Sequence, residues 1–471
     1  MGRRRNRMIL QAVVMIGGTA VITGLALNCH IRSSCERGII DVSGVKYYYN
    51  DNGLEGYGFT EIGDKRYLFS PTDHKMMTGL IGSFVTDGYY YFSPEDGSLQ
   101  TGFVNIDGQE HYFDPDTGFM ATGWVEVEGV KMFFDDNGVR ASGRVELDGE
   151  EYYFGEDNAL VKGWFNIGED RFHSSSDTGV IDKGITLIDG SYYYLDSESG
   201  AMRTGWIDEG SDRYYFMTDS GKAAEGLLQF GDTIYAFLNG KMLKDAKVVQ
   251  GRTLYYIGSD GTITRTVDGN RPLIALTFDD GPSQYTEQLV ETLESHGARA
   301  TFFIVGSRVD WYPDSVRHAY DIGCEMGNHT YEHTYLDKAS SEEVANVIGR
   351  TDDEIYEVTG VRTSVLRPPG GRVDDTLKQE TDLPIVLWSI DTRDWETRDV
   401  QSTINHVLGH VRDGDVILMH DIYESTVVAC ETIVPQLQAQ GFELVTVEEL
   451  GLINQGGLNP GQVYYSIRPP E

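Results

Sequence analysis

The sequence predicts two folded parts of different class. An all-β array of hairpin repeats, a solenoid, precedes an α/β domain of the distorted (β/α)7 barrel kind, and a transmembrane helix lies at the N-terminus. Three observations support this prediction: an apolar run behind clustered arginines, a glycine that recurs every 20 to 23 residues, and apolar strands that alternate with helical patterns. The predicted ranges are 1–40 for the membrane segment, 41–265 for the repeats, 272–452 for the barrel and 453–471 for a tail. Gly456-Gly457 and Pro469-Pro470 favour a flexible end for this tail.

Composition restricts the classes of function. A chain of 471 residues allows roughly two to four domains of about 100–200 residues each. Its 40% hydrophobic and 24% charged residues are typical of globular proteins. The net charge of -36 repels phosphate backbones, so we expect no nucleic-acid partner. Four cysteines without metal-site spacing are too few for a disulfide framework, and Cys29 with Cys35 either pair or remain thiols.

The N-terminal 40 residues have the pattern of a membrane segment. Four arginines between positions 3 and 7 precede an apolar run from Met8 to Leu27. About 20 such residues span the ~30 Å hydrocarbon core of a bilayer. The basic cluster predicts that the N-terminus lies inside and the rest of the chain outside. Because no small-x-small cleavage site follows, we interpret the segment as an uncleaved signal anchor, with secretion as the outcome if it is cleaved.

The middle of the chain is a repeat array. The recurring positions are Gly79, Gly102, Gly123, Gly143, Gly163, Gly184, Gly205 and Gly226. Each unit continues with an apolar residue, a turn and an aromatic cluster. Dipeptides such as Asp107-Gly108 and Asp148-Gly149, flanked by alternating aromatic residues, predict tight β-hairpins. One hairpin cannot bury its own apolar face, but a stack of hairpins can, so we expect a β-solenoid.

This array resembles the cell-wall-binding repeats of Gram-positive surface proteins, of the choline-binding and glucan-binding type. The resemblance implies ligand slots at the Gly-Trp tryptophans, where aromatic faces bind sugars by stacking or quaternary ammonium groups by cation–π attraction. These tryptophans are Trp124, Trp164 and Trp206. The corresponding positions of other repeats are Phe103, Arg144, Ile185 and Leu227. This loss of tryptophan speaks against choline, and it leaves open a cell-wall glycan ligand or a purely spacing role.

The last part of the chain alternates apolar strands with helical patterns, as from about Thr286 to His296. The expected strands are 273–278, 300–305, 325–327, 364–367, 384–388, 416–419 and 443–445. Such alternation predicts a parallel sheet, and seven strands in this length predict a barrel one strand short of eight. Catalytic groups of such barrels lie at the C-terminal ends of the strands, so polar residues there are candidates for chemistry.

Ionisable residues follow most of these strands. His329 and His333 are four residues apart, a spacing that suits one metal ion. A carboxylate from the first strand completes a set that leaves positions for water and substrate. Asp279 and Asp280 can then divide the work, one binding metal and the other accepting a proton from the attacking water. His420 can protonate the leaving group.

Five motifs in this order resemble those of the polysaccharide deacetylases, carbohydrate esterase family 4 with the NodB-homology domain. They lie at 277–282, 329–333, 367–370, 391–395 and 418–420. The resemblance implies that Asp279 is the general base and that Arg367 orients it. It also implies that Asp280, His329 and His333 bind one divalent metal ion, usually zinc, with cobalt or manganese as alternatives.

The same resemblance assigns the remaining motif residues. Asp394 holds and tunes His420, the general acid. Trp395, Asp391 and the loop at Gly370 contact the substrate, and the Gly370 backbone N–H is a candidate oxyanion donor. The family often has tyrosine at the Gly370 position, so the sugar groove of this chain lacks one side-chain wall there.

These expectations describe an enzyme at the surface of a Gram-positive-type bacterium. It removes N-acetyl groups from a cell-wall glycan, foremost N-acetylglucosamine of peptidoglycan. The motifs do not separate amides from esters, so a chitin-like or other amino-sugar polymer and an O-acetyl ester such as acetylxylan are alternatives. A non-catalytic carbohydrate-binding protein is the alternative from another class, and the complete motif set speaks against it.

Overall fold

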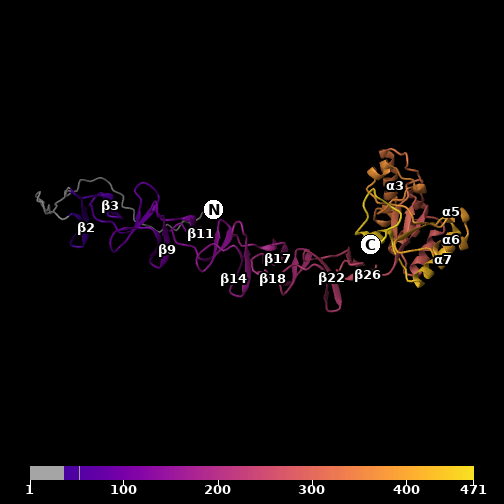
Figure 1. Ribbon diagram of the computed structural model, residues 1–471, viewed down its shortest axis with the longest axis horizontal. Helices are drawn as coiled ribbons and strands as arrows, with labels where there is room; N and C mark the ends of the chain where they lie inside the picture. Colours follow the sequence, from indigo (N-terminus) through magenta and orange to yellow (C-terminus); the bar gives the residue numbers. More distant parts are fainter. Residues whose placement is uncertain (1–36, 52–53, 471) are drawn as a thin grey trace. The chain divides into compact units, whose positions relative to one another are not determined.

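The computed structural model describes residues 37–51 and 54–470 (Figure 1). The chain divides into two compact units, with the boundary between Asp182 and Lys183. The predicted membrane segment and the candidate pair Cys29–Cys35 lie outside the described residues. Within the described part of the chain, no helix is both long and apolar enough to cross a membrane.

The first unit consists of antiparallel β-hairpins that follow one another along the chain. They are β1 (Gly38–Val42) with β2 (Val45–Tyr49), β3 (Gly58–Ile62) with β4 (Lys65–Phe69), β5 (Gly79–Gly82) with β6 (Tyr89–Phe92) and β7 (Leu99–Gln100), β8 (Gly102–Ile106) with β9 (Gln109–Phe113), β10 (Gly123–Val127) with β11 (Val130–Phe134), β12 (Gly143–Leu147) with β13 (Glu150–Phe154), and β14 (Gly163–Ile167) with β15 (Asp170–Ser174). Two-residue turns close most of them. Asp107 and Gly108 have φ of 53° and 87°, the left-handed pair that a type I′ turn requires.

Backbone hydrogen bonds join successive hairpins of this unit. The connection after each hairpin bonds to the hairpin before it: Met120 N donates to Tyr89 O, and Arg140 N donates to Glu110 O. A column of fully buried phenylalanines runs through the stack: Phe69, Phe92, Phe113, Phe134 and Phe154. The recurring glycine pairs with this column, since Gly123 lies opposite Phe134 and has a φ of 73°. The predicted stack of hairpins is therefore confirmed within this unit.

The second unit begins with further hairpin repeats. They are β16 (Gly184–Ile188) with β17 (Ser191–Leu195) and β18 (Met202–Arg203), β19 (Gly205–Glu209) with β20 (Asp212–Phe216), β21 (Gly226–Phe230) with β22 (Thr233–Leu238) and β23 (Lys241–Met242), and β24 (Ala246–Gln250) with β25 (Thr253–Ile257) and β26 (Ile263–Asp268). The last repeat shares a core with the α/β domain, because Leu254 and Val267 pack with Leu273, Leu450 and Ile453. The division into compact units thus falls inside the repeat array, and the predicted limits at 265 and 272 stay a prediction.

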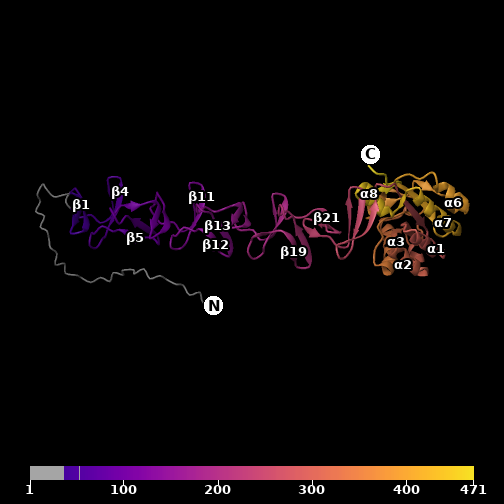
Figure 2. The same ribbon diagram turned by 90° about the horizontal axis from the view of Figure 1, so that it is seen from below.

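The α/β domain has parallel strands inside and helices outside, as the alternating pattern predicts (Figure 2). Its strands are β27 (Leu273–Asp279), β28 (Thr301–Ile304), β29 (Glu325–Asn328), β30 (Ile385–Val386), β31 (Ile390–Asp391), β32 (Asp415–His420), β33 (Glu443–Leu444) and β34 (Val463–Tyr464). The order β29-β28-β27-β32-β31 places the wholly buried β27 at the centre. Leu366 continues the parallel pairing, since it bridges Asn328 on one side and Ile385 on the other.

Helices and short 3-10 turns connect these strands. They are α1 (Thr286–Ser295), η1 (Gly306–Trp311), α2 (Pro313–Asp321), α3 (Ser341–Thr359), η2 (Pro369–Gly371), α4 (Asp375–Glu380), α5 (Asp394–Thr397), α6 (Val400–Val407), α7 (Glu424–Ala439) and α8 (Val447–Gln455). Helices α6, α7, α1, α2 and α3 follow one another around the outside of the strands. The connections at the C-terminal strand ends carry most of the motif residues.

The C-terminal tail differs from its prediction. The sequence predicts a flexible end from Leu452 onward, and this is wrong for the described residues. Strand β34 pairs in parallel with β30, and Ile467 is fully buried. The glycines that suggested flexibility instead end a helix, because Gly456 takes the left-handed conformation that closes α8. The tail thereby completes the barrel wall.

Candidate active site and metal centre

The predicted catalytic residues meet at one end of the barrel. Asp279 ends β27 and lies opposite His420, which ends β32. His329 directly follows β29, and Arg367 follows the bridging residue Leu366. The strands are parallel, so their C-terminal ends share one edge. The structure therefore brings together side chains that are up to 141 residues apart in the sequence.

Three of these side chains form a compact donor set. The ligand atoms of Asp280, His329 and His333 all lie within 4.8 Å of one another. The Nε2 atoms of His329 and His333 are 3.3 Å and 3.2 Å from Asp280 Oδ1. Asp280 and His333 have φ of 71° and 59°, in the left-handed region that is strained for residues with a side chain. Such strain commonly accompanies a functional site.

The tautomer of His329 follows from its partner. Its Nδ1 lies 2.6 Å from the carbonyl oxygen of Arg367. A carbonyl oxygen only accepts, so Nδ1 donates to it, and Nε2 is the ring nitrogen that faces Asp280. A backbone carbonyl bonded to the other ring nitrogen, as Arg367 O is here, commonly orients a metal-binding histidine.

The donor set fits a divalent metal ion. Asp280 Oδ1 is buried and has no hydrogen-bond partner among the described residues. Burial raises the pKa of Asp280, but the rings of His329 and His333 more than offset it and hold the pKa well below its usual range. Two imidazole nitrogens and one carboxylate are the ligands of many catalytic metal sites. A cation among these atoms would satisfy the otherwise unpaired oxygen.

A buried ion pair lies beside this set. Arg367 is fully buried, and its Nη1 donates to Asp279 Oδ1 at 2.7 Å. The rest of the guanidinium is also satisfied, since Nε and Nη2 donate to the carbonyl oxygens of Val386 and Leu387. The other oxygen of Asp279, Oδ2, lies 3.8 Å from Nε2 of His329. Arg367 therefore fixes one carboxylate oxygen and leaves the second beside the donor set.

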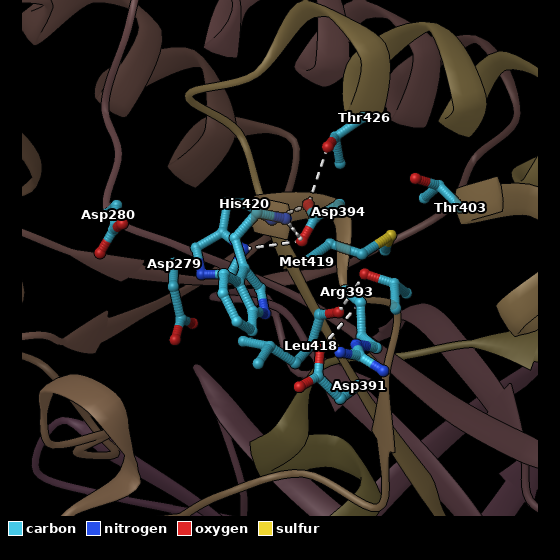
Figure 3. A network of polar contacts seen from close by, with 12 residues as sticks. Asp279, Asp280, Asp391, Arg393, Asp394, Thr403, Leu418, Met419, His420 and Thr426 are labelled. Carbon is cyan, nitrogen blue, oxygen red and sulfur yellow. Dashed lines mark hydrogen bonds and ion pairs between the residues drawn. The ribbon is translucent and has the colours of Figure 1, made fainter. Parts of the chain in front are cut away.

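His420 is held by a second buried carboxylate (Figure 3). Its Nδ1 lies 2.9 Å from Oδ1 of Asp394, whose Oδ2 accepts from the His420 backbone N–H and from the Thr426 hydroxyl. Burial lowers the pKa of His420, but Asp394 outweighs it and the pKa rises to about 9. Figure 3 shows Asp279 and Asp280 on the side of His420 away from Asp394. The ring is thus protonated at neutral pH beside the other site residues.

The predicted substrate-binding residues are more exposed than the catalytic residues and make fewer hydrogen bonds. Trp395 follows Asp394, the first residue of α5, and is exposed over about half of its surface. Asp391 is half-buried, and its Oδ1 accepts from the Arg393 backbone N–H. Gly370 has a φ of 65° within η2. These positions border the site but do not belong to its hydrogen-bonded core.

Sequence reasoning missed Tyr335 here and gave Asp421, at the end of its strand, no role. The exposed ring of Tyr335 packs edge-on against His333 and lies beside Gly370. Asp421 is fully buried, and its Oδ2 accepts from the hydroxyl of Thr286. Neither residue belongs to the motifs from which the site was predicted. Asp421 does follow His420 directly, and an acidic residue at a buried strand end was an available signal.

The repeat tryptophans lie in small aromatic clusters. Trp124 contacts Phe133 of its own hairpin and Tyr152 of the next, with ring centroids 5.3 Å and 5.1 Å apart. Trp206 contacts Tyr215 and Phe230 in the same way, at 5.2 Å and 4.9 Å. These clusters resemble slots in composition, but their rings already touch one another.

A cation of the chain covers each of the three predicted slots. The cation comes from the partner strand, seven residues after each tryptophan. Lys131 Nζ lies 4.5 Å from the Trp124 ring, Arg171 Cζ 4.2 Å from Trp164, and Arg213 Cζ 4.4 Å from Trp206. The aromatic face that would attract a quaternary ammonium ligand is therefore already paired with a positive charge.

Comparison with protein families gives two matches. Residues 266–384 match the polysaccharide deacetylase family. Residues 100–144 match a choline-binding repeat. The first match begins in β26, within the last hairpin repeat, and the second contains Trp124 with its covering Lys131.

Three curated relatives match the C-terminal part. The peptidoglycan-N-acetylmuramic acid deacetylase PdaC of Bacillus subtilis is 39% identical over 186 residues, which are 39% of this chain and 40% of the relative. The peptidoglycan-N-acetylglucosamine deacetylase PgdA of Listeria monocytogenes is 40% identical over 178 residues, 38% of each chain. A peptidoglycan-N-acetylglucosamine deacetylase of Bacillus cereus is 40% identical over 200 residues, 40% of this chain and 93% of the relative. The match thus spans about two fifths of the first two relatives and nearly all of the third.

Proposed function

This chain belongs to the polysaccharide deacetylase family, and from that premise we propose that it removes N-acetyl groups from N-acetylglucosamine of peptidoglycan. The observation that supports this activity is the meeting of the Asp280–His329–His333 donor set with Asp279 and His420 at one barrel end. The similarity to enzymes named for peptidoglycan supports the substrate class. The reaction is hydrolysis of an acetamide to acetate and a free amine.

We propose that Asp280, His329 and His333 hold one divalent metal ion, zinc in the first place and cobalt or manganese as alternatives. When such an ion is bound, it polarises an acyl oxygen and lowers the pKa of a water molecule beside it. The hydrogen bond from His329 Nδ1 to Arg367 keeps the lone pair of Nε2 directed at the site. Ionised Asp280 adds the negative charge that favours a cation.

Asp279 is the proposed general base. Its Oδ2 accepts the proton of the attacking water, while Oδ1 stays bonded to Arg367. The guanidinium is fully buried and bonded on every side, so it cannot rotate away from the carboxylate. Arg367 therefore acts on the reaction by fixing the orientation of Asp279.

His420 is the proposed general acid. Protonated below about pH 9, it gives the Nε2 proton to the departing amine nitrogen, and Asp394 stabilises the imidazolium and fixes its ring. Because the pKa of His420 is raised, the ring is fully protonated well below pH 9 and loses its proton as the pH rises through that value. Activity that needs this acid should fall over the same range. Trp395, Asp391 and the Gly370 N–H complete the proposal as substrate contacts.

We propose that the protein works outside the cell, at the wall. The similarity to peptidoglycan deacetylases and the wall-binding type of repeat support an extracellular or cell-wall location. We further propose that the N-terminal apolar segment anchors the chain in the membrane. The repeats would then hold the barrel against the glycan.

Acetate release tests the activity. The full chain, loaded with zinc, is incubated with peptidoglycan, with N-acetylated chitooligosaccharide and with acetylxylan in separate arms. We expect release from peptidoglycan, its loss with a chelator, and its return when zinc, cobalt or manganese is added back. Release that a chelator leaves unchanged would contradict the metal site, and release from acetylxylan alone would contradict an amide substrate.

The repeats give a second prediction. Because Lys131, Arg171 and Arg213 cover the tryptophan faces, we expect little retention of the full chain on choline resin and clear retention on purified wall. Each cation–π contact at an exposed site contributes about 0.5–1 kcal/mol, and a second cation would also meet like-charge repulsion. Replacing all three cations by alanine should increase retention on choline. Strong choline retention of the unaltered chain, or none gained by the triple variant, would contradict this explanation.

A further inference from the structure

An aromatic ring outside the predicted motifs borders the metal-type donor set. Tyr335 lies in the connection between β29 and α3, two residues after His333. Its ring packs edge-on against the His333 ring, with centroids 5.9 Å apart and planes at 68°. The side chain is nevertheless 49% exposed. An exposed tyrosine fixed beside a reaction centre is a suitable surface for a substrate ring.

Arg372 makes a further contact with the ring. The guanidinium of Arg372 lies over one face, with Cζ 4.2 Å from the ring centroid. Arg372 is in turn held near Asp337, with 3.8 Å between Nη1 and Oδ2. With these contacts in place, Tyr335 still keeps about half of its surface exposed. The ring is therefore pre-positioned, so stacking on it costs little conformational entropy.

The absence of a side chain at Gly370 leaves room for the Tyr335 ring. A Cβ built on Gly370 would lie 3.1 Å from Cε1 of Tyr335, closer than ordinary packing contacts. Its φ of 65° also disfavours any side chain. The sequence suggested that glycine at this position removes an aromatic wall from the sugar groove. In the structure, Tyr335 from a different loop occupies the neighbouring space.

We propose that Tyr335 is a sugar-binding residue that stacks on a pyranose ring of the glycan and so positions the acetamide at the donor set. This inference rests on the proposed function. Sugar rings present apolar C–H faces, and an aromatic face binds them by the same stacking that underlies aromatic pairs. Tyr335 then supplies an aromatic wall beside Gly370, which has no side chain of its own.

Kinetics of the zinc-loaded full chain on N-acetylated chitotetraose test this subsite. Tyr335→Ala should raise KM about 3- to 10-fold, the range expected from one aromatic contact, with kcat changed less than KM. Tyr335→Phe keeps the ring and should stay close to the unaltered enzyme. Bound zinc and thermal stability are measured on the same samples. If Tyr335→Ala loses zinc, the residue supports His333 instead and the proposal fails.

A direct binding measurement separates this proposal from the activity itself. Titration of chitotetraose into the Asp279→Asn protein, with and without Tyr335→Ala, should show the same 3- to 10-fold weakening without turnover. An active enzyme whose KM is unchanged by Tyr335→Ala would overturn the subsite alone, whereas an unaltered enzyme that releases acetate from neither chitotetraose nor peptidoglycan would overturn the proposed function.

Discussion

Asp279→Asn is expected to lower kcat for acetate release by about 10²- to 10⁴-fold, the contribution of a general base. The change removes the proton acceptor and also the negative charge beside the buried guanidinium of Arg367, so thermal stability is measured on the same samples. Asparagine has the same shape, and its amide oxygen can still accept from Arg367, which lies 2.7 Å from the present carboxylate. The acceptor Oδ2, beside the donor set, becomes an amide group that cannot take the proton of the attacking water.

The metal-binding set provides the control for this variant. Asp280, His329 and His333 are unchanged, so Asp279→Asn should bind zinc as the unaltered chain does. Arg367 keeps its bonds to Val386 and Leu387, which favours a retained fold. Asp375→Asn, a change at an exposed carboxylate paired with Lys378, should leave acetate release unaltered. Undiminished release by Asp279→Asn would exclude it as the base, and lost zinc would show that the variant reports on metal binding instead.

The motif residues could be predicted because parallel strands share one edge. Asp279 and His420 each end a strand whose preceding residues are mostly apolar, and such strands place their polar ends together whatever the loops between them. The repeats were predictable for a local reason as well. Asp107-Gly108 specifies a tight turn through left-handed φ, and a fixed period repeats that turn along the array.

Contacts between distant segments were beyond the sequence pattern. Tyr335 follows a motif but belongs to none, and its place beside Gly370 depends on the fold of two separate loops. The cation over Trp124 comes from the opposite strand, so only the hairpin register shows it. The tail was misread because Gly456 suits a flexible end and a helix C-terminus equally well. Local periodicity does not distinguish these cases, since burial decides them.

The junction between the last repeat and the barrel also depends on contacts between distant segments, which the sequence pattern does not show. Glu449 is fully buried in the first turn of α8, where it forms a capping box with Thr446. The guanidinium of Arg265 and the hydroxyl of Tyr256, both from the last repeat, donate to its Oε1. Burial raises the pKa of Tyr256, and the nearby carboxylate of Glu449 raises it further. The repeat thus supplies the cation that neutralises a buried carboxylate of the barrel.

Arg271→Ala is the matched control for this junction. Arg271 also joins the end of the repeat region to the barrel, through Glu443, but both side chains are partly exposed, at 45% and 29%. Exposed ion pairs contribute about 0–1 kcal/mol. Arg271→Ala and the test variant Arg265→Ala are each compared with the unaltered full chain by urea denaturation. Unfolding is followed through the loss of acetate release. Leu273, at the N-terminal end of β27, packs in the core that the last repeat shares. The catalytic residues lie at the opposite, C-terminal strand ends, so neither substitution touches them directly.

Arg265→Ala is expected to lower the free energy of unfolding of the barrel by about 2–4 kcal/mol. Removing one partner of a buried ion pair costs about 3–5 kcal/mol, and the 28% exposure of Arg265 reduces that cost because water can partly solvate the charge left behind. Adding Glu449→Gln to Arg265→Ala should recover part of the loss, since the unpaired charge is then absent. Equal effects of Arg265→Ala and Arg271→Ala would contradict this account. A larger loss for Arg265→Ala, relieved by Glu449→Gln, would instead show that the barrel depends on its adjoining repeat for charge balance as well as for packing.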